Sequence, residues 1–217
     1  MGRGIYGKIL FVNLKYNFRM PFASAFGVFV LTLTLFNITA LQSQDAAKPI
    51  EFLHCFIGVM LLVPVFYPEQ DANIRDVIRS KKVDYVVVCM IRIVYSVVAM
   101  AVFVAALLIV MKMCESDVGI GHFISGIASA WLLGAVGFAA AGMSNNVIIG
   151  YMTGILYYLA NYGLKDKWGP FFLFSMSYSG NYDAAGWKIF GAVVLMGITL
   201  LMCSGRRYRF GSVGRVL

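Results

Sequence analysis

Six long apolar stretches run along the 217 residues and are separated by shorter polar segments. They cover residues 21–42, 50–68, 85–111, 120–141, 146–164 and 186–204. Each approaches the ~20 apolar residues that an α-helix needs to cross a bilayer. Stretches such as 86–110 are apolar on almost every face and lack the alternation of barrel strands. The pattern predicts an all-α, polytopic membrane protein with six transmembrane helices.

Composition agrees with this prediction. Hydrophobic residues make up 60% of the chain, charged residues only 13%, and the mean hydropathy is +0.80, well outside the range of soluble domains. Residues 1–217 are therefore interpreted as a single transmembrane domain. No cleavable signal peptide is expected, because the first apolar stretch follows a basic segment and is too long for the apolar part of a signal.

The net charge of +8 is distributed as the positive-inside rule requires. If both termini are cytoplasmic, most of the 18 lysines and arginines lie inside. The outer cations are then Lys48, Lys112, Lys165, Lys167 and Lys188. This asymmetry predicts a multi-pass protein of the cell membrane with both termini inside and an even number of spans. It argues for contact with the lipid bilayer and against nucleic acid.

Two segments outside the six stretches have a membrane-surface character. Residues 4–19 predict an N-terminal interfacial helix, because Lys8, Lys15 and Arg19 share one stripe; a simple basic flank is the alternative. In 165–185 the apolar core Phe171–Met176 is too short to span. It predicts an extracytoplasmic segment that is either re-entrant or merely interfacial, with an unstructured loop as the alternative.

The second stretch is marked by prolines. Residues 43–49 predict a short polar loop, after which Pro49 and Glu51 form a plausible helix start. Pro64 and Pro68 fall in the last turns, where each frees a carbonyl and bends the helix.

Small residues recur in the fourth and fifth stretches. Gly126, Ala130 and Gly134 repeat every four positions, and Gly150 with Gly154 forms a GxxxG step. Such faces allow close helix approach. The approach can occur within the chain or between subunits.

Signatures of enzyme chemistry are absent from the sequence. It has no phosphate-binding GxxxxGK[ST] loop, no HExxH and no GxSxG. The two histidines, His54 and His122, lie far apart, so no metal site is expected. Among charges within the spans we single out Arg92, which either snorkels to the inner surface or pairs with Glu69.

Residues 69–84 form a charged island between the second and third stretches. Asn73 can cap a short helix whose apolar residues Ile74, Val77 and Ile78 share one face. The cations Arg75, Arg79, Lys81 and Lys82 cover the rest. Such a helix is suited to docking into a partner's groove; the alternative is a basic loop on the headgroups.

These residues resemble the permease subunits of ABC-2 type transporters. The resemblance rests on an acid that ends the second span (Tyr67-Pro68-Glu69), the short cytoplasmic helix 74–80, the basic stretch 81–84 and Arg92 one to two turns into the third span. The six-span layout, the basic N-terminus and the aromatic segment before the last span are similar too.

The resemblance implies a homodimer or heterodimer of permease chains, each on a separate ATP-binding cassette ATPase subunit. The chain itself would be no enzyme and bind no cofactor, with ATP and Mg on the partner. The coupling residues would be Ile74, Arg75, Val77, Ile78 and Arg79, with Glu69 and Arg92 at the inner gate.

We expect an exporter that moves an amphipathic or hydrophobic substrate, such as a peptide, antibiotic or lipid-like molecule, by alternating access. A channel or secondary transporter, and a non-transporting scaffold subunit, are the alternatives.

Overall fold

The computed structural model describes residues 18–70, 85–180 and 182–213, and these residues are almost entirely helical without any strand. The side chains of 69, 70, 85, 165, 166 and 204–213 are not described. The elements are α2 (Arg19–Leu35), α3 (Ser43–Pro49), η2 (Ile50–His54), α4 (Phe56–Leu62), η3 (Val63–Gln70), α6 (Tyr85–Met113), α7 (Ile120–Ser144), α8 (Val147–Leu164), η4 (Lys165–Phe171), α9 (Ser175–Ser179) and α10 (Ala184–Val213). The all-α prediction is confirmed.

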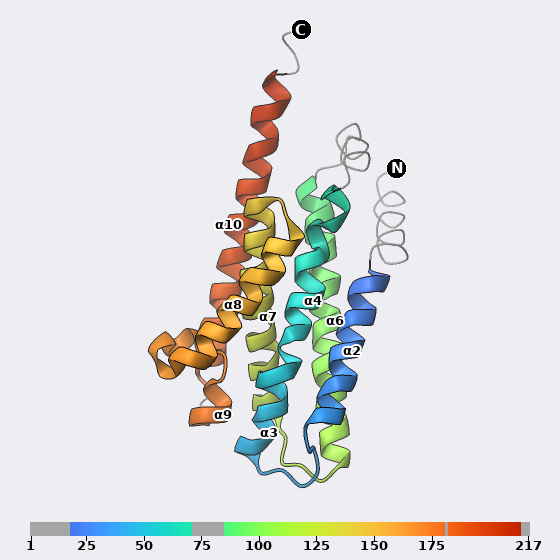
Figure 1. Cartoon of the computed structure of the whole chain (residues 1–217), viewed down its shortest axis with the longest axis vertical. Coiled ribbons are helices and arrows are strands. Elements are labelled where there is room, and N and C mark those ends of the chain that lie inside the picture. Colours follow the sequence, from blue (N-terminus) through green and yellow to red (C-terminus); the bar gives the residue numbers. More distant parts are fainter. Residues whose placement is uncertain (1–17, 71–84, 181, 214–217) are drawn as a thin grey trace.

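The long helices run roughly side by side, with α7 in the middle of the bundle (Figure 1). Helix α7 contacts α4, α6, α8 and α10, and α2 packs against α4 and α6 on the other side. The start of α2, the start of α6 and the end of α10 lie at one end of the bundle (Figure 1). The connections 36–42 and 114–119, together with α3 and α9, lie towards the other end.

Five helical stretches are long and apolar enough to cross a membrane: Ser43–Pro68, Val86–Met113, Ile120–Ser144, Val147–Leu164 and Ala184–Cys203. Helix α2 is also apolar but has only 17 residues, which corresponds to about 26 Å at 1.5 Å per residue. The described residues thus contain five candidate spans and one shorter apolar helix. A multi-pass membrane protein is compatible with this set.

The first helix ends earlier than the sequence prediction of 21–42. The Asn37 side chain accepts a hydrogen bond from the Thr39 amide at 3.2 Å, and Ala40 has a φ of 51°. Asparagine competes in this way for backbone groups that a helix would use. Residues 36–42 instead pair with the 114–119 connection, as in the 2.9 Å bond from the Ala40 amide to the Cys114 carbonyl.

The second stretch begins earlier than expected, because the predicted loop 43–49 is helix α3. Pro49 therefore lies inside a helical segment. It is followed by the π-helical turn η2. Proline has no amide to continue the usual i to i−4 bonding, and π turns of this kind occur often at functional sites.

The small-residue faces pack within the chain. A Cβ atom on Gly58 of α4 would lie 1.7 Å from the Ala130 carbonyl oxygen of α7. One on Gly134 would lie 2.5 Å from the Gly58 oxygen, and one on Gly150 of α8 would lie 2.7 Å from the Gly137 oxygen. Real Cβ atoms are excluded at such distances, so glycine is what lets α4, α7 and α8 approach so closely.

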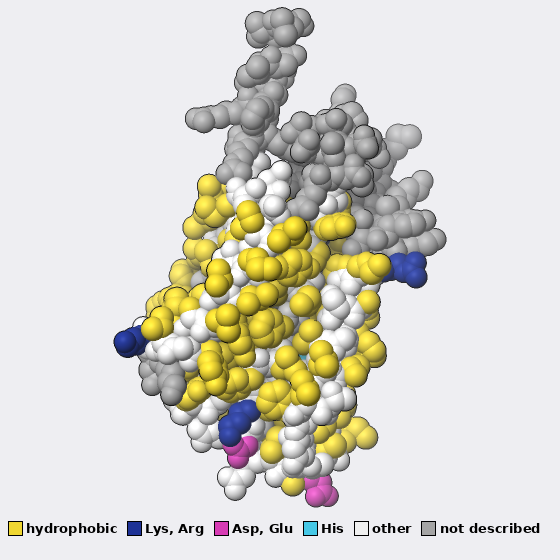
Figure 2. Space-filling view, viewed as in Figure 1, with side chains coloured by type: hydrophobic (Ala, Val, Ile, Leu, Met, Phe, Trp, Pro, Cys, Tyr) yellow, Lys and Arg dark blue, Asp and Glu magenta, His cyan; other side chains and the backbone are white. Residues whose placement is uncertain are grey.

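The outer surface of the bundle is apolar. Figure 2 shows hydrophobic side chains across the middle of the visible face, with the charged side chains of the described residues near its margins. A face with so many exposed hydrophobic side chains is typical of lipid contact.

The other predicted segments are described to different extents. The interfacial helix 4–19 lies outside the described residues apart from 18 and 19. Of 69–84, only the backbone of 69 and 70 is described, within η3. Segment 165–185 is described apart from 181. It contains η4 and α9.

Candidate functional site

A buried ion pair lies in the part of the bundle nearest α9. It joins Glu51 of η2 to Lys188 near the start of α10, with 3.7 Å between Nζ and Oε1. Both side chains have 0% exposure. The ion pair between Lys48 and Asp45, by contrast, is about half exposed. Charges buried to this degree need a specific reason, because each loses its hydration.

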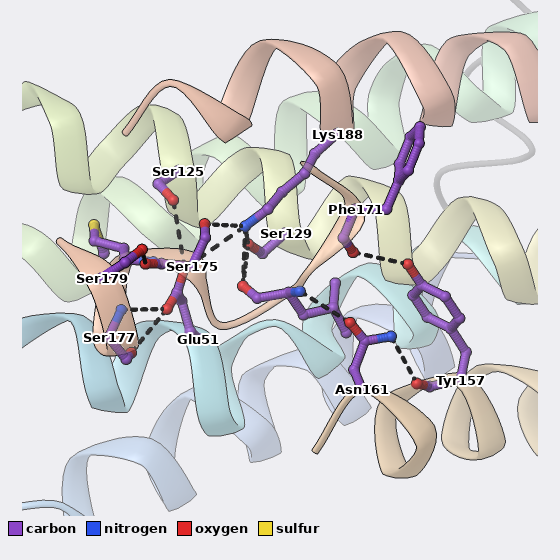
Figure 3. A network of polar contacts seen from close by, with 12 residues as sticks. Glu51, Ser125, Ser129, Tyr157, Asn161, Phe171, Ser175, Ser177, Ser179 and Lys188 are labelled. Carbon is purple, nitrogen blue, oxygen red and sulfur yellow. Dashed lines mark hydrogen bonds and ion pairs between the residues drawn. The ribbon is translucent and has the colours of Figure 1, made fainter. Parts of the chain in front are cut away.

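Lys188 is held by three neutral oxygens. Its ammonium group donates to the hydroxyl oxygens of Ser129 and Ser175, each at 2.9 Å, and to the Leu173 carbonyl at 3.0 Å (Figure 3). These bonds use all three of its N–H donors. At 3.7 Å, Glu51 is therefore a counter-ion rather than a fourth hydrogen-bond partner.

Glu51 caps the first turn of α9. One carboxylate oxygen accepts from the backbone amide and the hydroxyl of Ser177, both at 2.8 Å, and the other accepts from the Met176 amide at 3.2 Å. The first amides of a helix lack partners within the helix and favour a negative charge. Glu51 supplies the hydrogen-bond acceptors and the negative charge. Helix α9 is therefore fixed to η2 by charge as well as by hydrogen bonds (Figure 3).

Helix α8 holds the same segment from the other side. The Asn161 side chain accepts from the Leu173 amide at 3.0 Å, and the Tyr157 hydroxyl donates to the Phe171 carbonyl at 3.0 Å. The ring of Phe174 is fully buried, stacked on Phe52 at 4.7 Å between centroids. We call residues 171–179 the clamped segment, since α7, α8, α10 and η2 all bond to it.

Glu51 and Lys188 were not singled out as a pair in the sequence. The sequence pattern predicts a helix start at Glu51 and an outer cation at Lys188. The available signal was one acid and one base, each isolated in an apolar stretch, together with the serines of 175–179. Two lone charges of opposite sign in different spans are often partners, since neither is stable alone in an apolar interior.

Arg92 is buried rather than snorkelling, with 4% exposure. Its guanidinium donates to the Val65 carbonyl at 2.7 Å. In a 3-10 helix this carbonyl would accept from residue 68, which is a proline without an amide. Arg92 thus replaces the bond that Pro68 removes, and it ties α6 to η3.

A second donor on α6 lies one turn further along this helix. The Ser96 hydroxyl donates to the Leu61 carbonyl of α4 at 3.0 Å. Arg92 and Ser96 thus bond from α6 to the segment that contains Pro64 and Pro68.

The side chains of the remaining predicted site residues are not described. The coupling residues Ile74, Arg75, Val77, Ile78 and Arg79 lie outside the described residues. Glu69 lies at the end of η3, but its side chain is not described, so its ion pair with Arg92 stays a prediction.

Within the described residues, no group of three or more His, Cys, Asp or Glu side chains could hold a metal. His122 joins two elements instead: one ring nitrogen accepts from the Gly119 amide at 3.2 Å, and the other lies 2.8 Å from the Ser43 carbonyl. None of the four cysteines, all within the described residues, forms a disulfide.

No protein-family model matches the sequence, and no curated protein or solved structure is significantly similar to it. The function therefore has to be inferred from this chain's own residues.

Proposed function

We propose that this chain is the transmembrane permease subunit of an ABC-2 type exporter. The observation that carries the proposal is the placement of two polar features among the apolar helices. The charged segment 69–84 joins the second and third apolar helices, and the short elements η4 and α9 directly precede the last one. The resemblance described above rests on the same two features.

The proposal counts α2 as a sixth span. Its 17 residues come close to the thickness of the hydrocarbon core, and a basic N-terminal flank would anchor it. The ends of the described helices support a layout with both termini and 69–84 inside. Helix α2 starts, α6 starts and α10 ends at one end of the bundle (Figure 1), and the cation asymmetry makes this end cytoplasmic.

In this proposal the clamped segment enters the outer leaflet. Its core side chains are buried, and its polar backbone groups bond to Glu51, Asn161 and Lys188. Irregular backbone at membrane depth is tolerated where protein satisfies its hydrogen bonds, as here. The segment would close the outer end of the transport path.

Coupling would start at 74–80, where Ile74, Val77 and Ile78 dock into the ATPase subunit. The two helices on either side of this segment are η3 and α6, which the bond from Arg92 to Val65 joins. A push on the segment would therefore move both helices together. Closure of the ATPase pair would in this way switch the cavity between inward-facing and outward-facing states.

Other features of the proposal follow from the resemblance: a homodimer or heterodimer, ATP and Mg on the partner, and an amphipathic or hydrophobic substrate. A channel or secondary transporter would use intramembrane charges as an ion path. Against this, the three donors of Lys188 and both oxygens of Glu51 are already bonded to protein groups. A scaffold subunit would not need an ATPase that docks at residues 74–80.

The Val77→Asp variant tests the proposal. Burial of such a side chain is worth about 1.5–3 kcal/mol, and the new carboxylate would lie unpaired in the groove. We expect the permease to fold and insert while it loses the ATPase, or while ATP turnover is uncoupled from export. Val83→Asp, in the same segment but outside the predicted coupling helix, is the matched control.

The comparison needs co-purification of the ATPase, substrate-stimulated ATP turnover and export in one preparation. If Val77→Asp leaves all three unchanged, the coupling assignment fails.

A further inference from the structure

Helix α2 lies at the edge of the bundle, beside α4 and α6 (Figure 1). Its buried residues form one narrow stripe along the helix: Pro21, Ala25, Val28 and Thr32. Most of its large side chains are exposed instead, among them Met20, Phe26 and Leu35. Helices in lipid are not driven together by the hydrophobic effect, so close packing and interhelical hydrogen bonds must hold them. The narrow stripe gives α2 little packing of this kind.

The hydroxyl groups of α2 do not tie it to its neighbours. Ser24 and Thr32 each donate at 2.8 Å to a carbonyl three or four residues earlier in the same chain segment, and Thr34 does the same. The adjacent helix differs, because Arg92 and Ser96 of α6 bond to η3 and α4. Helix α2 is therefore attached more weakly than α6.

One end of α2 is nevertheless held firmly. Two backbone hydrogen bonds of 2.9 Å join the connection 36–42, which follows α2, to the connection 114–119. The Ser116 hydroxyl adds two more, since it donates to the Ile38 carbonyl at 2.6 Å and accepts from the Leu41 amide at 3.1 Å. Near the other end, the described ring contacts with α6 are aromatic pairs. A helix held in this way can pivot about 36–42.

A buried histidine lies behind α2. The His54 side chain of η2 is 1% exposed, and neither ring nitrogen has a hydrogen-bond partner among the described residues. The Phe29 ring of α2 packs against it, with 6.1 Å between the ring centroids. The Phe103 backbone of α6 is also close, but it does not meet hydrogen-bond geometry. Buried polar groups are nearly always hydrogen-bonded, and an unpaired one raises the free energy of the state that buries it.

We propose that α2 is a lateral gate of the bundle. It pivots about 36–42 and moves Phe29 away from His54, and water that enters beside α2 then bonds to the imidazole. The described state is the closed one, in which His54 is unpaired. The open state gains the missing hydrogen bonds, so His54 lowers the cost of opening. The proposal rests on these contacts and does not depend on the transport function.

Cysteine labelling measures how often this gate opens. The full chain, with its four native cysteines replaced by alanine, carries one new cysteine and is reconstituted in phosphatidylcholine vesicles. Ala25→Cys and Thr32→Cys report on α2, and Ala192→Cys reports on α10; all three native residues have 0% exposure. N-ethylmaleimide is used at a concentration at which labelling is slower than closing. The labelling rate then follows the open fraction.

The three positions should react at different rates. Ala25→Cys should react at least about tenfold faster than Ala192→Cys, because Lys188 and Ser129 bond α10 to α7. It should also react faster than Thr32→Cys, since Thr32 lies closer to the pivot. Labelling of Ala25→Cys no faster than that of Ala192→Cys, or equal rates at positions 25 and 32, would overturn the proposal.

Variants of His54 test its part in the opening. His54→Phe places an apolar ring of similar shape in the closed state and removes the unpaired nitrogens. It should slow labelling of Ala25→Cys about 5- to 30-fold and leave the rate of Ala192→Cys unchanged. His54→Gln keeps a buried polar group and should retain most of the original rate.

His54→Leu is a second apolar variant, in case the phenylalanine ring does not fit. Far-UV circular dichroism and tryptophan fluorescence show which variants are folded. If Ala25→Cys is labelled as fast in the folded apolar variants as with His54 present, the assigned role of His54 is wrong and the gate proposal fails.

Discussion

Removal of both partners of the buried ion pair should destabilise the protein by less than the sum of the two single removals. In Lys188→Met, Glu51 would remain charged and buried without its counter-ion. In Glu51→Gln, the Lys188 ammonium group would remain charged and buried with only uncharged hydrogen-bond acceptors. Breaking a buried pair in this way costs about 3–5 kcal/mol.

The double variant removes both charges and nearly keeps the side-chain shapes. Gln can still accept from Ser177 through one oxygen, so the main losses are the bond to the Met176 amide and the three bonds made by Lys188. At about 0.5–1.5 kcal/mol for a typical hydrogen bond, the double variant should be less unstable than the sum of the single variants. We expect a coupling free energy of about 1–3 kcal/mol.

Unfolding by SDS in mixed micelles, followed by far-UV circular dichroism and tryptophan fluorescence, measures each free energy. The pair of Lys48 and Asp45, with 52% exposure on both side chains, is the matched control. Its coupling should stay below about 1 kcal/mol. Additive effects of Glu51→Gln and Lys188→Met, or a loss in Lys188→Met no larger than in Lys48→Met, would refute the role assigned to the buried pair.

Two further predictions concern the helix contacts. Arg92→Met should lower the free energy of unfolding by about 1.5–3 kcal/mol, because the Val65 carbonyl loses a charged donor. Adding Pro68→Ala should restore part of this stability, because alanine returns a backbone amide. SDS unfolding of the double variant that shows no such rescue would contradict the prediction. Gly58→Ala should prevent correct packing, because its Cβ would overlap a facing carbonyl oxygen. Gly27→Ala, which meets nothing within 4 Å, should be neutral or slightly stabilising, and equal yields of the two folded variants would contradict the close approach.

The long, uniformly apolar stretches were enough to predict an all-helical fold, because lipid contact requires segments of this kind. It was less informative at the helix ends. The early end of α2 depends on Asn37 and on pairing with a distant connection, and α3 forms where seven mostly polar residues read as a loop. Tertiary contacts decided both cases, and a single sequence does not display them.

The candidate site was only partly accessible from sequence. The prolines at 64 and 68 were expected to free carbonyls, but nothing local shows that Ser96 and Arg92 would supply the donors. The ion pair joins residues of the second and last apolar stretches, and its capping of α9 exists only once the chain has folded. A single acid in one apolar stretch and a single base in another are the sequence features that indicate a buried ion pair of this kind.

Docking of residues 74–80 into a separate ATPase is tested most directly with a photo-cross-linking amino acid at position 77, in cells that express the native partners, with position 83 as control. We predict an adduct at position 77, and not at 83, with a protein that carries a phosphate-binding GxxxxGK[ST] loop, and a yield that changes when ATP hydrolysis is trapped with vanadate. Equal cross-linking to lipid at both positions, with no ATPase adduct, would contradict the claim.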